Sequence, residues 1–284
     1  MNNGIFKFQI GAFECFSIFD GYYEGGQAEN LFSNAPGNLL DAALKKHNLS
    51  HINIHLPCTC LFIDTGREKI LVDTGYGIYS NENPLAPNSG RLLKNLSVLG
   101  ISPEQIDLVI LTHCDGDHIG GTINEKGEPR FKNARYVITK KEWSYWKNQL
   151  RNNLLSTEES QFISKYLFSI EKRVELISDK SEIVPGITSA VFPGHSAGHL
   201  ALEIFSKNKK MVYISDIVCH LIHLEYPDWK MSFEYDPDQA VMSRNKIFTK
   251  ITNEDSLVFG FHLPFPALGR IKKKESKYSW YPYE

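Results

Sequence analysis

The stretch Leu111–Gly121, which reads LTHCDGDHIGG, constrains the fold more than any other part of the sequence. It places two histidines and two aspartates within the six residues from His113 to His118. The preceding run Ile106–Leu111 is apolar and predicts a buried strand, and the two following glycines predict a sharp turn. The cluster is therefore expected at the end of a strand, where open sheets covered by helices expose their ligand-binding crevices.

Composition and charge narrow the class of protein. The chain has 284 residues, of which 42% are hydrophobic and 23% charged, so we expect a single globular domain spanning residues 1–284. A formal net charge of -2 does not favour nucleic acid or an anionic membrane as a partner. The N-terminus lacks the features of a secretory signal, and no apolar run approaches the roughly 20 residues of a membrane span. We therefore expect a cytoplasmic protein.

The five cysteines are scattered singly, apart from the pair Cys58-Thr-Cys60, and are expected to be reduced. On a strand, Cys58 and Cys60 would point to the same face, which could suit a soft metal. No second cysteine pair completes a four-sulfur site, however. We expect both residues to be small buried side chains.

The periodicity of apolar residues and the turn signals predict the remaining elements. An antiparallel start over residues 5–19 is expected to break at Asp20-Gly21, and a hairpin over residues 59–75 to end in Asp73-Thr-Gly75. Residues 140–166 are expected to be helical and to form a lid-like insertion over about residues 140–175. The other expected elements are helices at 38–47, 91–99 and 238–250 and strands at 134–139, 187–192, 200–205, 211–215 and 256–260.

Four predicted strand ends are each followed at once by residues that bind metals. These residues are His113, Asp115, Asp117 and His118, then His195, then Asp216, and finally His262. Two first-row cations that share a bridging carboxylate need about seven imidazole and carboxylate ligands, with positions left for water. A closed structural zinc site needs only four ligands and favours sulfur. The set therefore predicts a catalytic site with two metals.

The motif series resembles that of the metallo-β-lactamase-fold hydrolases. It comprises His113-Cys-Asp-Gly-Asp-His118 before two glycines, Pro193-Gly-His-Ser-Ala-Gly-His199, Asp216 at a strand end and the late His262, with Asp73-Thr-Gly75 matching that family's structural turn. The order is the family's own, and the resemblance covers nearly the whole chain. The segments His262–Pro266 and Tyr278–Pro282 look most like the branch that contains methyl parathion hydrolase and quorum-quenching lactonases.

The resemblance implies an α/β (α+β) fold, a four-layer αββα sandwich with a two-metal site at one sheet edge. It implies the following ligands: His113, Asp115 and His195 for metal one, Asp117, His118 and His262 for metal two, and Asp216 as the bridge. A hydroxide between the metals would attack a small ester, lactone or phosphoester, and Asp117 or Asp216 would hold or shuttle a proton. The resembling branch also implies a small-molecule substrate and a possible homodimer, and the charge and hydropathy predict no membrane or nucleic-acid partner.

Asp115 departs from the family pattern, in which the usual ligand is histidine. Zinc is the metal that the resemblance implies, but a hard oxygen donor shifts the preference of metal one toward iron or manganese. Two alternatives to the hydrolase therefore stay open, namely a diiron redox enzyme and a metal-poor binding or sensing module. Asp115 itself is either a ligand or a carboxylate that orients His113.

Several other residues have weaker expectations. His199 resembles the histidine that closes its motif without binding metal, and Cys219 stands where lactonases often place a tyrosine, three residues after the bridging aspartate. Asp20 is expected to act in a turn. His220 and His223 are expected either in the pocket or in packing, and Trp143, Tyr145 and Trp146 in helix packing.

Overall fold

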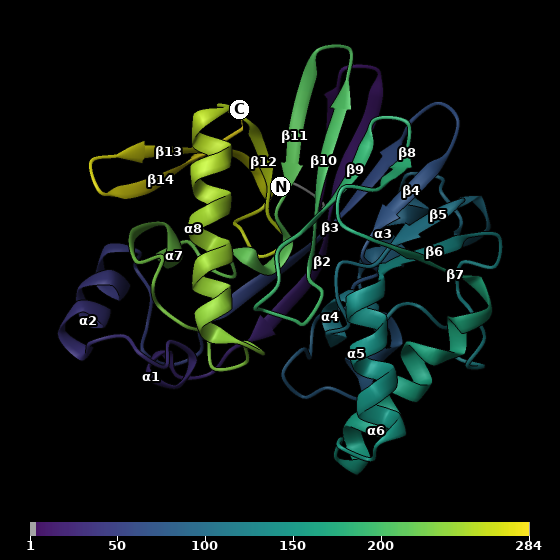
Figure 1. Cartoon of the computed structure of the whole chain (residues 1–284), viewed down its shortest axis with the longest axis horizontal. Coiled ribbons are helices and arrows are strands. Elements are labelled where there is room, and N and C mark those ends of the chain that lie inside the picture. Colours follow the sequence, from purple (N-terminus) through teal and green to yellow (C-terminus); the bar gives the residue numbers. More distant parts are fainter. Residues whose placement is uncertain (1–3, 284) are drawn as a thin grey trace.

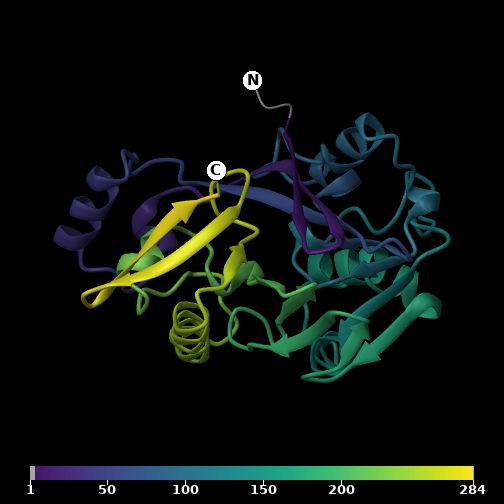
Figure 2. The same cartoon turned by 90° about the horizontal axis from the view of Figure 1, so that it is seen from above.

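Two seven-stranded mixed sheets pack face to face in the computed structural model, which describes residues 4–283 (Figures 1 and 2). The first sheet has the order β1-β2-β3-β4-β5-β6-β7 and the second β14-β13-β12-β11-β10-β9-β8. The strands of the first sheet are β1 (Ile5–Ile10), β2 (Phe13–Glu24), β3 (His55–Asp64), β4 (Lys69–Val72), β5 (Leu108–Ile110), β6 (Arg135–Thr139) and β7 (Val174–Ile177). Those of the second are β8 (Glu182–Val184), β9 (Ile187–Val191), β10 (Leu200–Ser206), β11 (Lys209–Tyr213), β12 (Leu257–Phe259), β13 (Leu268–Lys274) and β14 (Lys277–Pro282).

Helices cover the outer faces of the sheets, and several short helices lie within the loops that connect the strands. The α-helices are α1 (Ala28–Leu31), α2 (Gly37–Lys46), α3 (Leu92–Val98), α4 (Gly116–Ile119), α5 (Lys140–Arg151), α6 (Thr157–Tyr166), α7 (Ile222–Glu225) and α8 (Pro237–Asn253). The 3-10 helices are η1 (Gly77–Asn81), η2 (Pro103–Gln105), η3 (Phe168–Arg173) and η4 (Ser215–Ile217). The two sheets with their outer helices confirm the predicted αββα sandwich.

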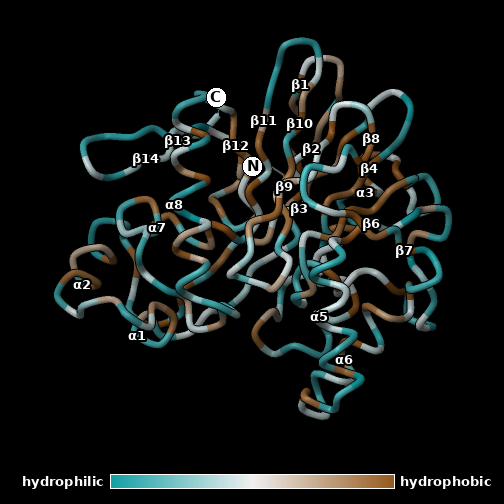
Figure 3. The backbone as a smooth tube through the Cα atoms, viewed as in Figure 1, coloured by the Kyte–Doolittle hydropathy of each residue, from teal (hydrophilic) through white to brown (hydrophobic). Residues whose placement is uncertain are grey.

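Successive side chains of a strand point to opposite faces of the sheet, and this alternation explains the layers. Val258 packs with α8 on the outer face of the second sheet, whereas the next residue, Phe259, lies in the core between the sheets. There Phe259 stacks on Phe8 of the first sheet, with ring centroids 6.4 Å apart. Figure 3 shows hydrophobic strand centres, such as those of β4, β6 and β12, and hydrophilic tips at the β10–β11 and β13–β14 turns.

Parallel pairs within each sheet place several strand ends at one edge. In the first sheet β4 and β5 run parallel, and in the second β11 and β12 do. The carboxyl ends of parallel neighbours meet at the same edge of a sheet, so the loops after them lie side by side. This geometry brings the polar residues that follow β5, β11 and β12 together.

The structure corrects two predicted boundaries. The first hairpin turns at Gly11, which has φ +61°, and β2 continues through Asp20-Gly21 to Glu24. The predicted helix over residues 140–166 is two helices, because α5 ends at Arg151 and Ser156 opens α6 with a capping box. Within residues 4–283, no helix has the length and hydrophobicity to cross a bilayer.

Candidate active site

Four histidines from three segments of the chain turn the same nitrogen toward a common centre. In each ring the Nδ1 atom contacts a group behind it, which leaves Nε2 facing the other ligand candidates. The contacts of Nδ1 are His118 to Asp73 Oδ2 (2.9 Å), His262 to the carbonyl oxygen of Pro57 (2.9 Å), His113 to Thr112 Oγ1 (3.1 Å) and His195 to Cys219 Sγ (3.8 Å). This orientation is what metal-binding imidazoles require.

The first group of donor atoms comprises His113, Asp115 and His195. The two Nε2 atoms lie 3.1 Å apart, and Asp115 Oδ2 is 3.5 Å from His113 Nε2 and 3.3 Å from His195 Nε2. Ligand atoms that share one ion are about 3 to 4 Å apart, because each lies about 2.0 to 2.3 Å from the metal. The structure therefore places Asp115 at ligand distance from both histidines.

The second group comprises Asp117, His118, His262 and Asp216. Asp117 Oδ2 is 3.6 Å from His118 Nε2 and 3.4 Å from His262 Nε2. Asp216 Oδ1 is 3.3 Å from His118 Nε2, and its Oδ2 is 2.8 Å from His262 Nε2 and 3.7 Å from His195 Nε2. Asp216 thus reaches both groups, as a bridging carboxylate must.

The chemistry of this donor set fits divalent cations. His118 Nε2 is completely buried and has no hydrogen-bond partner, although it lies among carboxylates. Burial lowers the pKa of His118, but nearby carboxylates, chiefly Asp117 and Asp216, outweigh it and raise that pKa well above its usual range. Among residues 4–283, only histidines form ion pairs with Asp117 and Asp216. The cluster therefore calls for positive charge, which two divalent metals supply.

Asp73 is a positioning residue whose role sequence reasoning missed. It follows β4 with φ +60°, and its Oδ1 accepts hydrogen bonds from the backbone N–H and the hydroxyl of Thr112. Its Oδ2 accepts from the Tyr213 hydroxyl at 3.0 Å and faces His118 Nδ1. An aspartate directly after a buried strand, in the sequence Asp73-Thr-Gly75, was a signal for this role, since carboxylates commonly orient metal-binding histidines.

Glu142, on α5, fixes the loop that carries His195, and no spacing in the sequence revealed it. Its fully buried carboxylate accepts hydrogen bonds from Ser196 Oγ at 2.8 Å and from the backbone N–H of Gly198 at 2.7 Å. It also accepts from Trp146 Nε1 at 2.9 Å. The first helix of the predicted insertion thereby positions part of the site.

The expectation that Asp20 acts in a turn is wrong. Asp20 is the extra residue of a β-bulge in β2, where the register shifts between Phe19 and Gly21. Its buried carboxylate accepts hydrogen bonds from the backbone N–H groups of Tyr76, Gly90 and Leu92. Asp20 thus anchors the loop between β4 and α3 to the first sheet.

Gly120 and Gly121 lie in the predicted turn, and close packing explains why both residues are glycine. Gly120 has φ -61°, an ordinary helical value, so no left-handed turn requires it. A Cβ atom at Gly120 would lie 2.3 Å from the carbonyl oxygen of Tyr76, and one at Gly121 would lie 2.3 Å from that of Thr74. These glycines allow the loop after β4 to pack closely against the ligand-bearing segment.

The remaining candidates separate into packing and pocket residues. His199 Nε2 accepts a hydrogen bond from the backbone N–H of Asp216, and His223 is buried with its ring edge against Phe32. Trp143 packs in the core, as predicted. Trp146 also packs against this core, and in addition it lines the pocket over the donor atoms.

That pocket has a volume of about 260 Å³ and joins the two donor groups to an aromatic wall. The wall is built from Tyr23, Tyr76, Tyr79, Trp146, Phe162 and Phe233, which come from β2, the loop after β4, α5, α6 and the segment before α8. The site therefore offers polar chemistry at its floor and an apolar surface above it.

Comparison with known proteins agrees with this geometry. The family model described as the metallo-beta-lactamase superfamily matches residues 54–262. An N-acyl homoserine lactonase of Bacillus cereus is 25% identical over 244 residues, which cover 80% of this chain and 84% of the relative. The match therefore extends over most of the length of both this chain and the relative.

Two solved structures resemble the chain over its whole length. AidC, a dizinc quorum-quenching lactonase solved with a product, has a TM-score of 0.89 and 28% identity, covering 99% of this chain and 98% of its own. The hydrolase AbOPH of the beta lactamase superfamily has a TM-score of 0.87 and 25% identity, covering 100% and 99%. These findings favour neither the redox enzyme nor the metal-poor module. The predicted resemblance is confirmed: the chain belongs to the metallo-beta-lactamase superfamily and is a metal-dependent hydrolase.

Proposed function

We propose that this chain hydrolyses lactones that carry an apolar substituent, with N-acyl homoserine lactones as the first class to test. The observation that carries the proposal is the pocket in which the carboxylate–imidazole floor meets an aromatic wall. A lactone ring with an acyl chain has the same two parts, a hydrolysable polar head and an apolar tail. The lactonase names of a curated relative and a solved structure support this choice.

The proposed ligands of metal one are His113, Asp115 and His195, and those of metal two are Asp117, His118 and His262, with Asp216 as the bridge. Their mutual distances and the orphaned His118 Nε2 support this assignment. Two divalent cations there would polarise the carbonyl oxygen of the substrate and lower the pKa of a water molecule. Zinc is the proposed metal, because the donors of metal two are mainly imidazoles and carboxylates and AidC is a dizinc enzyme.

The chain's own groups orient the substrate and move a proton. Tyr23 and Tyr76 line the pocket, and burial, followed by the charge of Asp117, raises the pKa of both phenols. Both therefore stay protonated at neutral pH and can donate to a substrate oxygen. Asp117 is the better proton carrier, because its side chain is 13% exposed in the pocket whereas that of Asp216 is 3% exposed.

A substrate panel tests the proposal. We would measure kcat/KM for N-acyl homoserine lactones of several chain lengths, γ-butyrolactone, an aryl ester and a phosphotriester, using protein with its native metal. The acylated lactones should give the highest values, rising with chain length as the tail covers the aromatic wall. A higher kcat/KM for the phosphotriester or aryl ester would contradict the substrate class.

Substitution of the proposed ligands tests the metal site. His118→Ala and Asp216→Ala should abolish turnover and lower metal content while the circular dichroism spectrum stays unchanged. Asp107→Asn is the control, because Asp107 is an exposed carboxylate that accepts one backbone hydrogen bond. Undiminished rates in either ligand variant would refute the assignment.

Asp115 has its own test. Asp115→His should raise zinc occupancy relative to manganese, because it replaces a hard oxygen donor with an imidazole. Unchanged occupancy would show that Asp115 does not bind metal.

The single domain, the homodimer and the cytoplasmic location stay predictions. The mass of the protein in solution tests the homodimer.

A further inference from the structure

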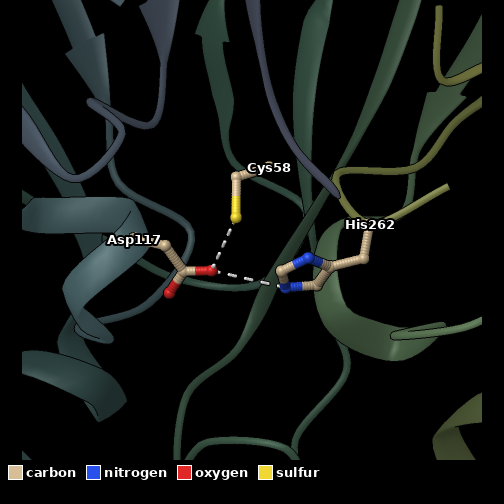
Figure 4. A group of neighbouring side chains, drawn as sticks. All are labelled: Cys58, Asp117 and His262. Carbon is tan, nitrogen blue, oxygen red and sulfur yellow. Dashed lines mark hydrogen bonds and ion pairs between the residues drawn. The ribbon is translucent and has the colours of Figure 1, made fainter. Parts of the chain in front are cut away.

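A thiol lies beside the second group of donor atoms. Cys58, on β3, is completely buried, and its Sγ is 3.6 Å from Asp117 Oδ2. Figure 4 shows this thiol and the His262 imidazole directed at the same oxygen of Asp117. His262 Nε2 lies 3.4 Å from that oxygen, and the three donor atoms are all within 4.8 Å of one another.

These distances match those between ligands of one ion. Atoms bound to a tetrahedral zinc are about 3.3 to 3.8 Å apart, since Zn–N and Zn–O bonds are about 2.0 to 2.2 Å and Zn–S bonds about 2.3 Å. Both contacts to Asp117 Oδ2 fall in this range. His118 Nε2, which is buried without a hydrogen-bond partner, lies 3.6 Å from the same oxygen. Three donors thus surround Asp117 at metal–ligand spacing.

We propose that Cys58 is a sulfur ligand of metal two, in addition to Asp117, His118, His262 and Asp216. The inference rests on the proposed metal positions, and it goes beyond them because the motif series of the family contains no such cysteine. Binding releases the thiol proton to water, so that the thiolate faces the cation.

The two metal positions are then chemically unlike. Metal one has the carboxylate of Asp115 where the family pattern has an imidazole, and metal two gains the sulfur of Cys58. Thiolates select soft or borderline ions such as zinc and cadmium, whereas carboxylates suit manganese and iron. Metal two should therefore retain zinc or cadmium, and metal one should accept a harder ion.

The other cysteines near the site do not have this placement. Cys219 also belongs to a group of donor atoms, with His195 and Asp216, but its Sγ faces His195 Nδ1 at 3.8 Å, whereas His195 Nε2 faces His113 and Asp115. Cys60 is buried two residues along the same strand. Within residues 4–283 it belongs to no group of donor atoms close enough to hold an ion. Cys60 is therefore the matched control, and Cys219 is the rival sulfur that the experiment must separate from Cys58.

Absorption spectra of the cobalt-loaded full-length protein test the inference. Wild type and Cys60→Ala should both show a near-ultraviolet thiolate-to-cobalt charge-transfer band, and Cys58→Ala and Cys58→Ser should lose it. The visible d–d bands report cobalt binding independently. Two bound cobalt ions with d–d bands but no charge-transfer band would overturn the sulfur ligand and leave the metal positions standing. Failure to bind cobalt would overturn both.

If Cys219→Ala loses the charge-transfer band and Cys58→Ala keeps it, then Cys219 and not Cys58 is the sulfur ligand, and the proposal is overturned.

A second measurement needs no variant. Cadmium-113 NMR of the wild-type protein should give two resonances, of which one lies downfield as sulfur ligation requires. Two resonances that both lie in the nitrogen–oxygen region would refute the inference. In Cys58→Ser, the affinity for one cadmium ion should fall by about a hundredfold or more, since even residues that only hydrogen-bond to a ligand change metal affinity by about 10- to 100-fold.

Discussion

Arg244 should be a major determinant of stability, and its replacement tests how the site's loops are held. Its side chain, on α8, is completely buried. The guanidinium donates to the carbonyl oxygens of Ile217, Pro227 and Trp229 at 2.8 to 2.9 Å and to Glu234 Oε1 at 2.5 Å. Ile217 directly follows Asp216, the proposed bridging ligand, so Arg244 fixes the loop that carries this carboxylate.

We expect Arg244→Met to lower the free energy of unfolding by about 6 to 8 kcal/mol. Methionine keeps much of the volume, but the Glu234 carboxylate, which is fully buried, would lose its counter-ion. Breaking a buried ion pair on one side costs about 3 to 5 kcal/mol, and each lost hydrogen bond adds about 1 kcal/mol. With a urea m-value of about 3 kcal/mol/M, the midpoint of unfolding should fall by more than about 1 M.

Urea unfolding followed by tryptophan fluorescence measures this effect. The double variant Arg244→Met/Glu234→Leu should regain part of the loss, because it removes the unpaired carboxylate. Lys147→Met is the surface control, since its partner Glu171 is about half exposed and such pairs contribute about 0 to 1 kcal/mol. The reasoning fails if Arg244→Met and Lys147→Met have the same midpoint, or if the double variant is no more stable than Arg244→Met.

Three further substitutions test the residues around the site. Asp73→Asn should weaken the binding of one metal by about 10- to 100-fold, because His118 loses its orienting carboxylate; equal metal retention after dialysis against a chelator would refute this. Glu142→Ala should lower kcat/KM about tenfold or more, because the loop that carries His195 loses two hydrogen bonds, while the circular dichroism spectrum is preserved. An unchanged rate would show that Glu142 does not position this loop. Trp146→Ala should raise KM for long-chain lactones and leave KM for γ-butyrolactone unchanged; an equal change for both would place Trp146 outside the tail's path.

The candidate ligands were predictable because each follows a strand in a recognisable pattern. His113 and His118 stand in one short motif, and Asp216 and His262 each come directly after an apolar run. Parallel neighbours bring such strand ends to one edge, so local patterns were enough to predict the group. Asp115 was identified as a departure from the family, and the structure places it within 3.5 Å of both histidines of metal one.

The supporting residues were not predictable in the same way. Asp20 has the Asp-Gly signature of a turn, yet its carboxylate anchors a loop more than fifty residues away because a bulge redirects it. In the sequence Glu142 is an ordinary helical glutamate, and only the fold brings its carboxylate to the backbone N–H of Gly198. Such roles depend on contacts between distant segments, which have no local signature.

The sequence by itself determined the family, the strand-and-loop rhythm and the histidines and aspartates that gather at one edge, since these follow from short motifs and from periodicity. Only the tertiary structure decided how the donors face one another, why Gly120 must be small and which thiol lies at the metal side. Cys58 illustrates the difference, because in sequence it is one of two equivalent strand cysteines. Both cysteines are buried in the core, but packing places the sulfur of Cys58 3.6 Å from Asp117 Oδ2. Within residues 4–283, Cys58 and not Cys60 lies in a group of donor atoms close enough to hold an ion.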